Sequence, residues 1–226
     1  MARNRGELVS VVVPCLLLPD KGGELLRFTH EAFDSLVNWT RQNELELVVV
    51  DNGSVIGVDY LEGAANVYIR NGENLGFAKA VNQGLRAAAG DWLVVMNNDV
   101  TLIHDWIANA IEQWDGRTGI VSSHLHAHDP EHKAGREVAP WGHFFGALWM
   151  THRGVLNEVG YLDEQFERGM FEDRDLVRRV VQTGRQHIKT GWCHHVGNAT
   201  WGKLPEQQRI YLENKARFEA KWSLTS

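Results

Sequence analysis

The stretch Gly90–Val100, which reads G-D-W-L-V-V-M-N-N-D-V, constrains the fold more than any other part of the chain. Its apolar run, Leu93–Met96, follows a Gly-Asp turn and leads directly into Asn97, Asn98 and Asp99. Such a run is typical of a strand that is buried on both faces of a parallel sheet. Ligands bind at the carboxyl edge of these sheets, so the three polar side chains are expected to point into a crevice.

Two interpretations of this strand end are open. A lone carboxylate, Asp99, flanked by amides suits a hard divalent cation such as Mn²⁺ or Mg²⁺ that keeps phosphate and water oxygens as its other ligands. Alternatively, Asn98 and Asp99 are turn formers that only close the strand. The other strands of the chain bear on this choice.

Composition limits the classes of partner. The chain has 226 residues, of which 43% are hydrophobic, and this is enough to fill the core of one α/β domain. Its net charge is −6 and it has no basic run, so non-specific nucleic-acid binding and binding to an anionic membrane are not expected.

The sequence predicts a cytoplasmic protein. Cys15 ends an apolar run and Cys193 sits in a polar one, so a disulfide scaffold is not expected and a reducing compartment is favoured. No segment approaches the roughly 20 apolar residues of a transmembrane helix. The N-terminus also lacks the apolar core of a signal peptide.

Alternating strand and helix patterns predict a doubly wound nucleotide-binding half over about residues 8–100. The first strand, Leu8–Val13, stops at Pro14, and a helix with a regular apolar stripe follows over 24–39. The second strand, Leu45–Val50, runs into the polar cluster Asp51-Asn52-Gly53-Ser54. Two strands therefore end in acid-amide turns on what should be one edge of the sheet.

A third strand, Asn66–Arg70, and a helix beginning near Phe77 complete this half. Gly90 is expected to stop that helix. Its amino end, near Asn74, would present free backbone N–H groups together with Lys79 to the same edge, which favours a phosphate seat there.

The second half, about residues 101–226, is predicted to carry the acceptor and the catalytic groups. An apolar, aromatic stretch, Trp141–Met150, is expected to be a strand that also floors a pocket, so Trp141 is a candidate acceptor contact. The remaining elements expected are a helix around Trp106–Trp114, a strand over 119–123, a helix over 153–159, a short strand near 187–189 and a final helix to Trp222.

Glu172 and Asp173 open a predicted helix that ends at Gly184. A carboxylate at a helix N-terminus is stabilised in its ionised form and would suit a general base. Plain N-capping by Asp173 is the structural alternative. Asp175 lies two positions on, about 200° around the helix, and should not point the same way.

Two groups of histidines invite a metal-site interpretation. His194 and His195 precede a glycine turn, and one of them could complete a site with Asp99, although a surface pair is the alternative. The sequence does not decide which of the two is the ligand. His124–His132 could be a metal site or the face of a ragged strand that runs into a loop, and nothing there supplies a closed ligand set.

Taken in order, these motifs resemble the family 2 glycosyltransferases of the GT-A fold, especially the rhamnosyltransferase-like branch. The resemblance covers about Val9 to Thr200. It implies an α/β fold of one domain, with a doubly wound, mixed and mostly parallel sheet flanked by helices. The motifs that carry it are V-S-V-V-V-P, V-V-V-D-N-G-S, N-L-G-F-A-K-A-V-N-Q-G, the M-N-N-D variant of the D-x-D motif, G-Y-L-D-E-Q-F with F-E-D-R-D-L, and the late His-x-Gly.

The resemblance implies an inverting, metal-dependent transfer of a hexosyl or deoxyhexosyl group from a nucleotide-diphosphate sugar to an acceptor hydroxyl. Asp173 would be the catalytic base, Asp99 and His195 the ligands of Mn²⁺ or Mg²⁺, and Glu172 an acceptor contact. Asp51 would pair with the ring N–H of the base. Together with the residues at the strand ends and the helix start, the donor-binding residues expected are Pro14, Cys15, Asp51, Asn52, Asn74, Lys79, Asn97 and Asn98.

Some features depart from the family pattern. Cys15 replaces a small hydroxyl residue, and Asn97 removes one carboxylate of the D-x-D motif. The chain is also expected to lack the C-terminal extension that many members use for acceptors or membranes. The sequence leaves the sugar, the nucleotide and the acceptor open, whether glycan, lipid-linked sugar, protein or small molecule, and it leaves a homodimer open as well.

Two rival functions remain at this stage. A nucleotidyltransferase also uses a doubly wound half and a divalent cation, but the loop L-L-L-P-D-K-G-G is poor in the basic residues that it needs. A catalytically silent nucleotide-sugar-binding protein is favoured by Asn97 and opposed by the presence of both Asp99 and Asp173.

Overall fold

A computed structural model describes residues 8–19, 23–40, 45–125, 135–197 and 206–223. In this part of the chain a nine-stranded sheet has the order β3-β2-β1-β4-β8-β6-β9-β5, and β7 pairs with β9. The strands are β1 (Val9–Cys15), β2 (Leu45–Asp51), β3 (Val67–Arg70), β4 (Trp92–Met96), β5 (Val100–Leu102), β6 (Thr118–Leu125), β7 (Glu137–Val138), β8 (Leu148–His152) and β9 (Gln186–His195).

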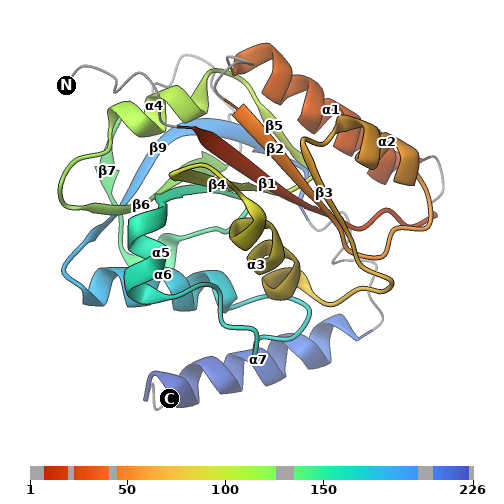
Figure 1. The fold of residues 1–226 in the computed structure, drawn as a ribbon. Coiled ribbons are helices and arrows are strands. Elements are labelled where there is room, and N and C mark those ends of the chain that lie inside the picture. The colour runs from red at the N-terminus through yellow and green to blue at the C-terminus, as the bar shows by residue number, and fades with distance from the viewer. Residues whose placement is uncertain (1–7, 20–22, 41–44, 126–134, 198–205, 224–226) are drawn as a thin grey trace.

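Helices cover both faces of this sheet (Figure 1). Apolar side chains of α1, α2 and α4 pack on one face, and those of α3, α5 and α6 pack on the other. The last helix, α7, packs on neither face and forms a small aromatic cluster below the second layer. The helices are α1 (Glu24–Trp39), α2 (Val58–Ala64), α3 (Phe77–Ala87), α4 (Trp106–Glu112), α5 (Arg153–Val159), α6 (Glu172–Gln182) and α7 (Gln207–Lys221).

The sheet is mixed, as the sequence predicts. Strands β3, β2, β1 and β4 are parallel, whereas β8 runs antiparallel to both β4 and β6. Strand β4 lies at the centre and is fully buried, which agrees with its uninterrupted apolar run. The carboxyl ends of β1, β2 and β4 therefore meet at one edge.

Several elements differ from the sequence-based expectation. Helix α2 and strand β5 were not predicted, because seven- and three-residue elements give little periodicity to read. The strand expected over Trp141–Met150 begins only at Leu148, and a short 3-10 helix, Trp141–His143, takes its place after Pro140.

The short strand expected near 187–189 is also longer than predicted. Strand β9 continues through Gly191 to His195, so the histidine pair lies at a strand end. Gly191 has a φ of +60°, and the pairing of β9 with β6 is irregular at this point. A bulge of this kind lets the strand continue past Gly191, where the glycine in the sequence suggests that the strand ends.

No helix in the described ranges is long and apolar enough to cross a membrane. Cys15 and Cys193 are both buried and free.

Candidate active site

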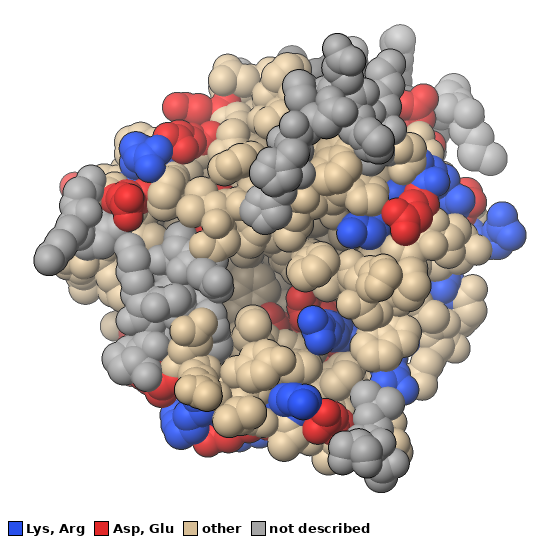
Figure 2. All heavy atoms as spheres, turned by 180° about the vertical axis from the view of Figure 1, so that it is seen from behind, with Lys and Arg blue, Asp and Glu red and all other residues tan. Residues whose placement is uncertain are grey.

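A cavity of about 480 Å³ opens at the carboxyl edge of the parallel strands. Figure 2 shows a hollow near the middle of one face, where a few acidic and basic side chains stand among uncharged ones. The cavity brings together residues from both halves of the chain. The predicted site residues that line it are Pro14, Cys15, Asn52, Asn74, Asn97, Asn98, Glu172, Asp173 and His195.

Asn52 organises the loop before α3, on the side of the cavity that we call the donor side because the predicted donor-binding residues Asn52 and Asn74 line it. Its amide nitrogen donates to Asn74 Oδ1 over 3.0 Å and to the Gly76 carbonyl over 3.3 Å. Its amide oxygen accepts from the Asn71 side chain and from the Leu75 backbone N–H. The amide of Asn52 is thus committed to holding the loop before α3 in place beside the cavity.

Asp51 does not line the cavity, although the family resemblance places it against the base. Its side chain is fully buried and accepts from the Ser54 backbone N–H over 2.7 Å and from the Tyr68 hydroxyl over 2.8 Å. Arg70 lies 3.5 Å away. Burial and the Asp51 carboxylate raise the pKa of Tyr68 to about 12. The Asp51 carboxylate is therefore bonded to protein groups, and its predicted contact with a nucleotide base is not supported by this arrangement.

Asp99 and His195 meet because β5 and β9 pair antiparallel with Val100 opposite His195. The backbone N–H of Val196 donates to the Asp99 carbonyl, and His195 Nε2 lies 3.1 Å from Asp99 Oδ1. The Asp99 side chain is 9% exposed and that of His195 15%. Of the two histidines, the one with the His-x-Gly context therefore faces the carboxylate, whereas His194 is exposed.

The residues around this pair fit a divalent cation as a partial ligand set. The pair supplies a carboxylate and an imidazole. Asn97, which lines the same cavity as His195, has an amide oxygen that is buried with no hydrogen-bond partner among the described residues. The described residues contain no group of three or more His, Cys, Asp or Glu arranged to hold a metal. The missing ligands would be phosphate and water oxygens, which Mg²⁺ and Mn²⁺ commonly retain.

Asp173 reaches across the cavity wall instead of capping its own helix. The N-cap of α6 is Phe171, which makes no side-chain cap hydrogen bond. Asp173 Oδ2 accepts from the Gly146 backbone N–H over 3.0 Å, and Oδ1 accepts from the Arg174 backbone N–H over 2.7 Å. Capping is therefore not its role in the usual N-cap sense.

Gly146 leaves no room for a larger residue beside this carboxylate. A Cβ at this position would lie 2.9 Å from Asp173 Oδ2, closer than side-chain carbons approach oxygen. Gly146 belongs to the stretch Trp141–Met150, which the sequence predicts to be a strand. At Gly146 this stretch is a turn, and its backbone comes close to the Asp173 carboxylate.

Glu172 and Asp173 form a pair of neighbouring acids with different surroundings. Burial, and then the charge of Asp173, raise the pKa of Glu172 well above its usual value. Burial also raises the pKa of Asp173, but the N–H groups of Arg174 and Gly146 and the charge of Arg174 oppose this. Glu172 Oε2 has no hydrogen-bond partner among the described residues. Asp173 is consequently the more readily ionised acid of the two.

Asp175 points away from the cavity, as the helical spacing predicts. It is fully buried, and its carboxylate contacts Arg179 and Lys221 over 2.9 and 2.7 Å.

Two further predicted site residues lie elsewhere. Lys79 is exposed and lines a second, smaller cavity of about 230 Å³ beside the first turn of α3. Trp141 packs against Phe218 of α7 and against the Arg178 guanidinium, 4.9 Å from its ring centre. Neither residue lines the main cavity, so their predicted contacts with donor and acceptor are not supported by this arrangement.

The wall formed by Arg168, Gly169 and Met170 has no counterpart in the sequence-based expectation. Arg168 is the one Lys or Arg among the described residues that line the main cavity. The only signal for it in the sequence is the turn-like R-G-M between G-Y-L-D-E-Q-F and F-E-D. His126, His128 and His132 of the second histidine group lie outside the described residues.

Residues 10–160 match the glycosyl transferase family 2, which is more than half of the chain. The protein belongs to that family. A curated relative, the uncharacterized protein y4gI of Sinorhizobium fredii (strain NBRC 101917 / NGR234), is 23% identical over 257 aligned positions. This match covers 95% of the present chain, which spans only 27% of the relative's length.

Solved structures with the same fold include several glycosyltransferases. The mannosyltransferase PcManGT from Pyrobaculum calidifontis, in complex with GDP-Man and Mn²⁺, has a TM-score of 0.70 at 17% identity, covering 97% of this chain and 65% of that one. GalNAc-T7 with UDP, GalNAc and Mn²⁺ has a TM-score of 0.69 at 16% identity, covering 97% and 51%. TarS 1–349 of S. aureus has a TM-score of 0.65 at 15% identity, covering 94% and 72%. The GT-A fold expected from the sequence is confirmed.

Proposed function

We propose that this protein transfers a sugar from a nucleotide-diphosphate sugar to an acceptor hydroxyl, with inversion at the anomeric carbon. The observation that supports it best is a single cavity lined both by His195, paired with Asp99, and by the Asp173 carboxylate. The first pair suits a cation beside a diphosphate, and the second group suits a general base. Membership of the glycosyl transferase family supports the same reaction class.

The proposed mechanism is one displacement. Asp173 accepts the proton of the acceptor hydroxyl while that oxygen forms a bond to the anomeric carbon. The bond from this carbon to the phosphate oxygen breaks, and the nucleoside diphosphate leaves with the electron pair. The Gly146 N–H orients the Asp173 carboxylate during this step. Burial raises the pKa of Asp173 toward the pH at which the reaction would run. A general base is most effective when its pKa lies near that pH.

The cation would be held by Asp99, His195 and Asn97, and when bound it supplies charge neutralisation for the leaving diphosphate. Mn²⁺ is the first ion to test, because PcManGT and GalNAc-T7 were both solved with it. Mg²⁺ is the second.

On the donor side, Pro14, Cys15, Asn52, Asn74 and Asn98 would bind the nucleotide, and Glu172 would contact the sugar or the acceptor. The transfer of a hexosyl or deoxyhexosyl group, the relation to the rhamnosyltransferase-like branch and a cytoplasmic location stay predictions from the sequence. The acceptor and a homodimer likewise stay open.

A thermal-shift panel tests the proposal. Nucleotide sugars with UDP, GDP and dTDP are added with and without Mn²⁺, since a ligand that binds only the folded state raises the melting temperature. We expect one nucleotide class to stabilise the protein in the presence of the cation, and the matching sugar to be hydrolysed slowly to nucleoside diphosphate. Release of pyrophosphate would indicate a nucleotidyltransferase, and binding without any turnover would indicate a silent binding protein.

A further inference from the structure

The segment 167–171, which precedes α6, has an unusual backbone. Only four non-glycine residues in the described ranges have a positive φ, and three of them are Arg168, Met170 and Phe171, at 64°, 76° and 77°. Left-handed backbone in residues with a Cβ costs free energy, so it persists only where surrounding contacts enforce it. Something outside this segment must therefore hold it.

Asn214 of α7 provides those contacts. Its side chain is fully buried, and its amide nitrogen donates to the carbonyl oxygens of Glu167 and Gly169 over 2.9 and 2.8 Å. A third, longer contact of 3.4 Å reaches the Met170 carbonyl. The amide oxygen accepts from Arg217 over 2.9 Å, which fixes the orientation of the amide. One side chain thus gathers three carbonyl groups of the turn.

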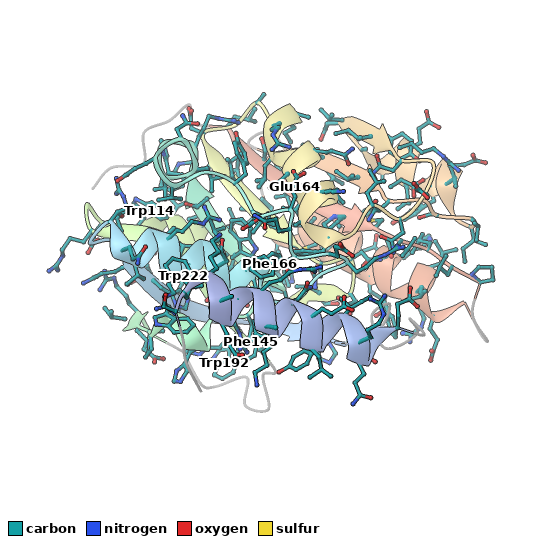
Figure 3. All side chains as sticks on the ribbon, turned by 90° about the horizontal axis from the view of Figure 1, so that it is seen from below. Trp114, Phe145, Glu164, Phe166, Trp192 and Trp222 are labelled. Atoms are coloured by element: carbon teal, nitrogen blue, oxygen red, sulfur yellow. The ribbon has the colours of Figure 1, made fainter. Side chains whose placement is uncertain are left out.

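Aromatic packing on α7 fixes the two ends of the same segment. Phe166, which immediately precedes the segment, and Phe171, its last residue, are both buried against Phe218, with ring centres 6.4 and 5.5 Å from that of Phe218. Seen from below, α7 lies across the molecule with Phe166 and Trp222 along it (Figure 3). The turn therefore rests on α7 at both ends and at its middle.

The same segment forms part of the cavity wall. Arg168, Gly169 and Met170 line the cavity, and the Arg168 guanidinium donates to the Asn74 carbonyl over 2.8 Å on the donor side. The segment also leads directly into Glu172 and Asp173. A shift of the turn would move both this bridge to the donor side and the start of the helix that carries the acids.

We propose that Asn214 is a positioning residue for the transfer reaction. It holds the segment 167–171 in the conformation that places Arg168 against Asn74 and sets the start of α6, with its two acids, at the cavity. Asn214 lies outside the cavity lining and touches no reacting atom. This inference rests on the proposed function for its kinetic part only. The structural part, that Asn214 holds the turn, stands independently.

Two substitutions and one control test it. Asn214→Ala removes the donor, and Asn214→Asp places a second carboxylate oxygen against three carbonyl oxygens. Ile210→Ala is the control, because Ile210 is buried on the same helix and makes no side-chain hydrogen bond to the turn. Each variant is studied by melting temperature, by UDP or GDP affinity with Mn²⁺, by nucleotide-sugar hydrolysis, and by limited trypsin digestion with mass spectrometry of the Arg168–Gly169 cleavage.

We expect both Asn214 variants to be cut after Arg168 at least about tenfold faster than the control at an equal distance below their melting temperatures. Turnover should fall about 10- to 100-fold, more for Asp than for Ala, because small misplacements of reacting groups cost this much. Nucleotide affinity should stay within about threefold, since Asn52 and Asn74 remain in place. The ratio of turnover to affinity is the quantity that a purely structural role would not change.

The outcomes separate the two levels of the inference. Equal cleavage in the Asn214 variants and the control would overturn the claim that Asn214 holds the turn. Faster cleavage with turnover equal to that of the control would overturn its role in positioning. If wild type released no nucleoside diphosphate from any sugar tested, the proposed function would fail together with the kinetic part, while the trypsin result would still decide the structural part.

Discussion

The donor side of the cavity, which includes Asn52 and Asn74, and its catalytic side, which includes Arg168 and Asp173, are held together in different ways. On the donor side, the hydrogen bonds of Asn52 reach partners only 19 to 24 residues away, within two successive β-α units. On the catalytic side, Arg168 reaches Asn74, 94 residues away, and Asn214 holds Glu167 and Gly169 from 47 and 45 residues away. Local patterning thus builds the first side, and the second depends on distant parts of the chain meeting correctly.

The largest effect on the difference between the two sides is expected for Asp173→Asn. The variant keeps the shape of the side chain but cannot take a proton, so turnover should fall about 10²- to 10⁴-fold. Nucleotide affinity, which depends on the donor side, should hardly change. Steady-state hydrolysis and calorimetric binding measure the two quantities. Retained turnover would remove Asp173 as the base and leave Glu172 as the next candidate.

The next largest effect is expected for Asp99→Asn, which leaves the strand end with amides and no formal charge. Cation-dependent nucleotide binding should weaken by at least about 10- to 100-fold, the range found even for residues that only support metal ligands. His195→Ala should weaken it too, and His194→Ala, on the exposed neighbour, serves as the matched control. Nucleotide affinity measured during a titration with Mn²⁺ gives these effects. Equal, small effects at the two histidines would favour the alternative interpretation, in which they are a surface pair without a metal role.

A smaller and pH-dependent effect is expected for Glu172→Gln. A carboxyl whose pKa is raised in the folded state keeps its proton as the pH rises past its unfolded value of about 4.3, so the wild type loses stability from there up to the folded pKa. The Gln variant lacks this loss. Its melting temperature should therefore match that of wild type near pH 4 and exceed it at pH 8.

The same pair of variants tests whether Glu172 acts in its neutral form. If it does, Glu172→Gln should turn over much more like wild type than Glu172→Ala does, because the amide keeps a donor and an acceptor. A Gln variant as slow as Asp173→Asn, with no gain in stability at pH 8, would show that Glu172 is ionised.

The smallest effect is expected for Lys79→Gln. Lys79 is exposed and lies outside the main cavity, so nucleotide affinity should change by no more than about twofold, as for most surface substitutions. Arg168→Gln, which removes the cation that does line the cavity, should weaken binding more. A larger loss of nucleotide affinity in Lys79→Gln would support the phosphate-binding site that the sequence predicts at the start of α3.

The sequence predicts the donor side well because its signals are local. The strand β4 and the polar turn after it are visible as one apolar run followed by Asn97, Asn98 and Asp99, and α1 begins and ends where the apolar stripe places it. Residue spacing does not predict burial. From its position at a strand end, Asp51 is predicted to line the cavity, yet Tyr68 and Arg70 from β3 enclose it.

The catalytic side was predicted only at its acids. Glu172 and Asp173 are visible at a helix start, but their differing surroundings come from Gly146 and from the turn at Arg168, which no periodicity marks. Trp141 was expected in the cavity because an aromatic stretch resembles a pocket floor. It packs instead between α6 and α7, since the arrangement of α7 cannot be read from its own weakly patterned sequence.

The pairing of β5 with β9 has a consequence for the order in which the site forms during synthesis. Asp99 follows the central strand β4 directly, but its partner His195 lies about 100 residues later on a strand whose register alone brings the two together. A slip of one residue would turn His195 to the opposite face of the sheet. At ribosomal rates of about 5–20 residues per second, Asp99 waits roughly 5–20 s for that strand. A nascent chain that has completed the parallel half therefore has Asp99 in place but lacks His195 and both acids of α6.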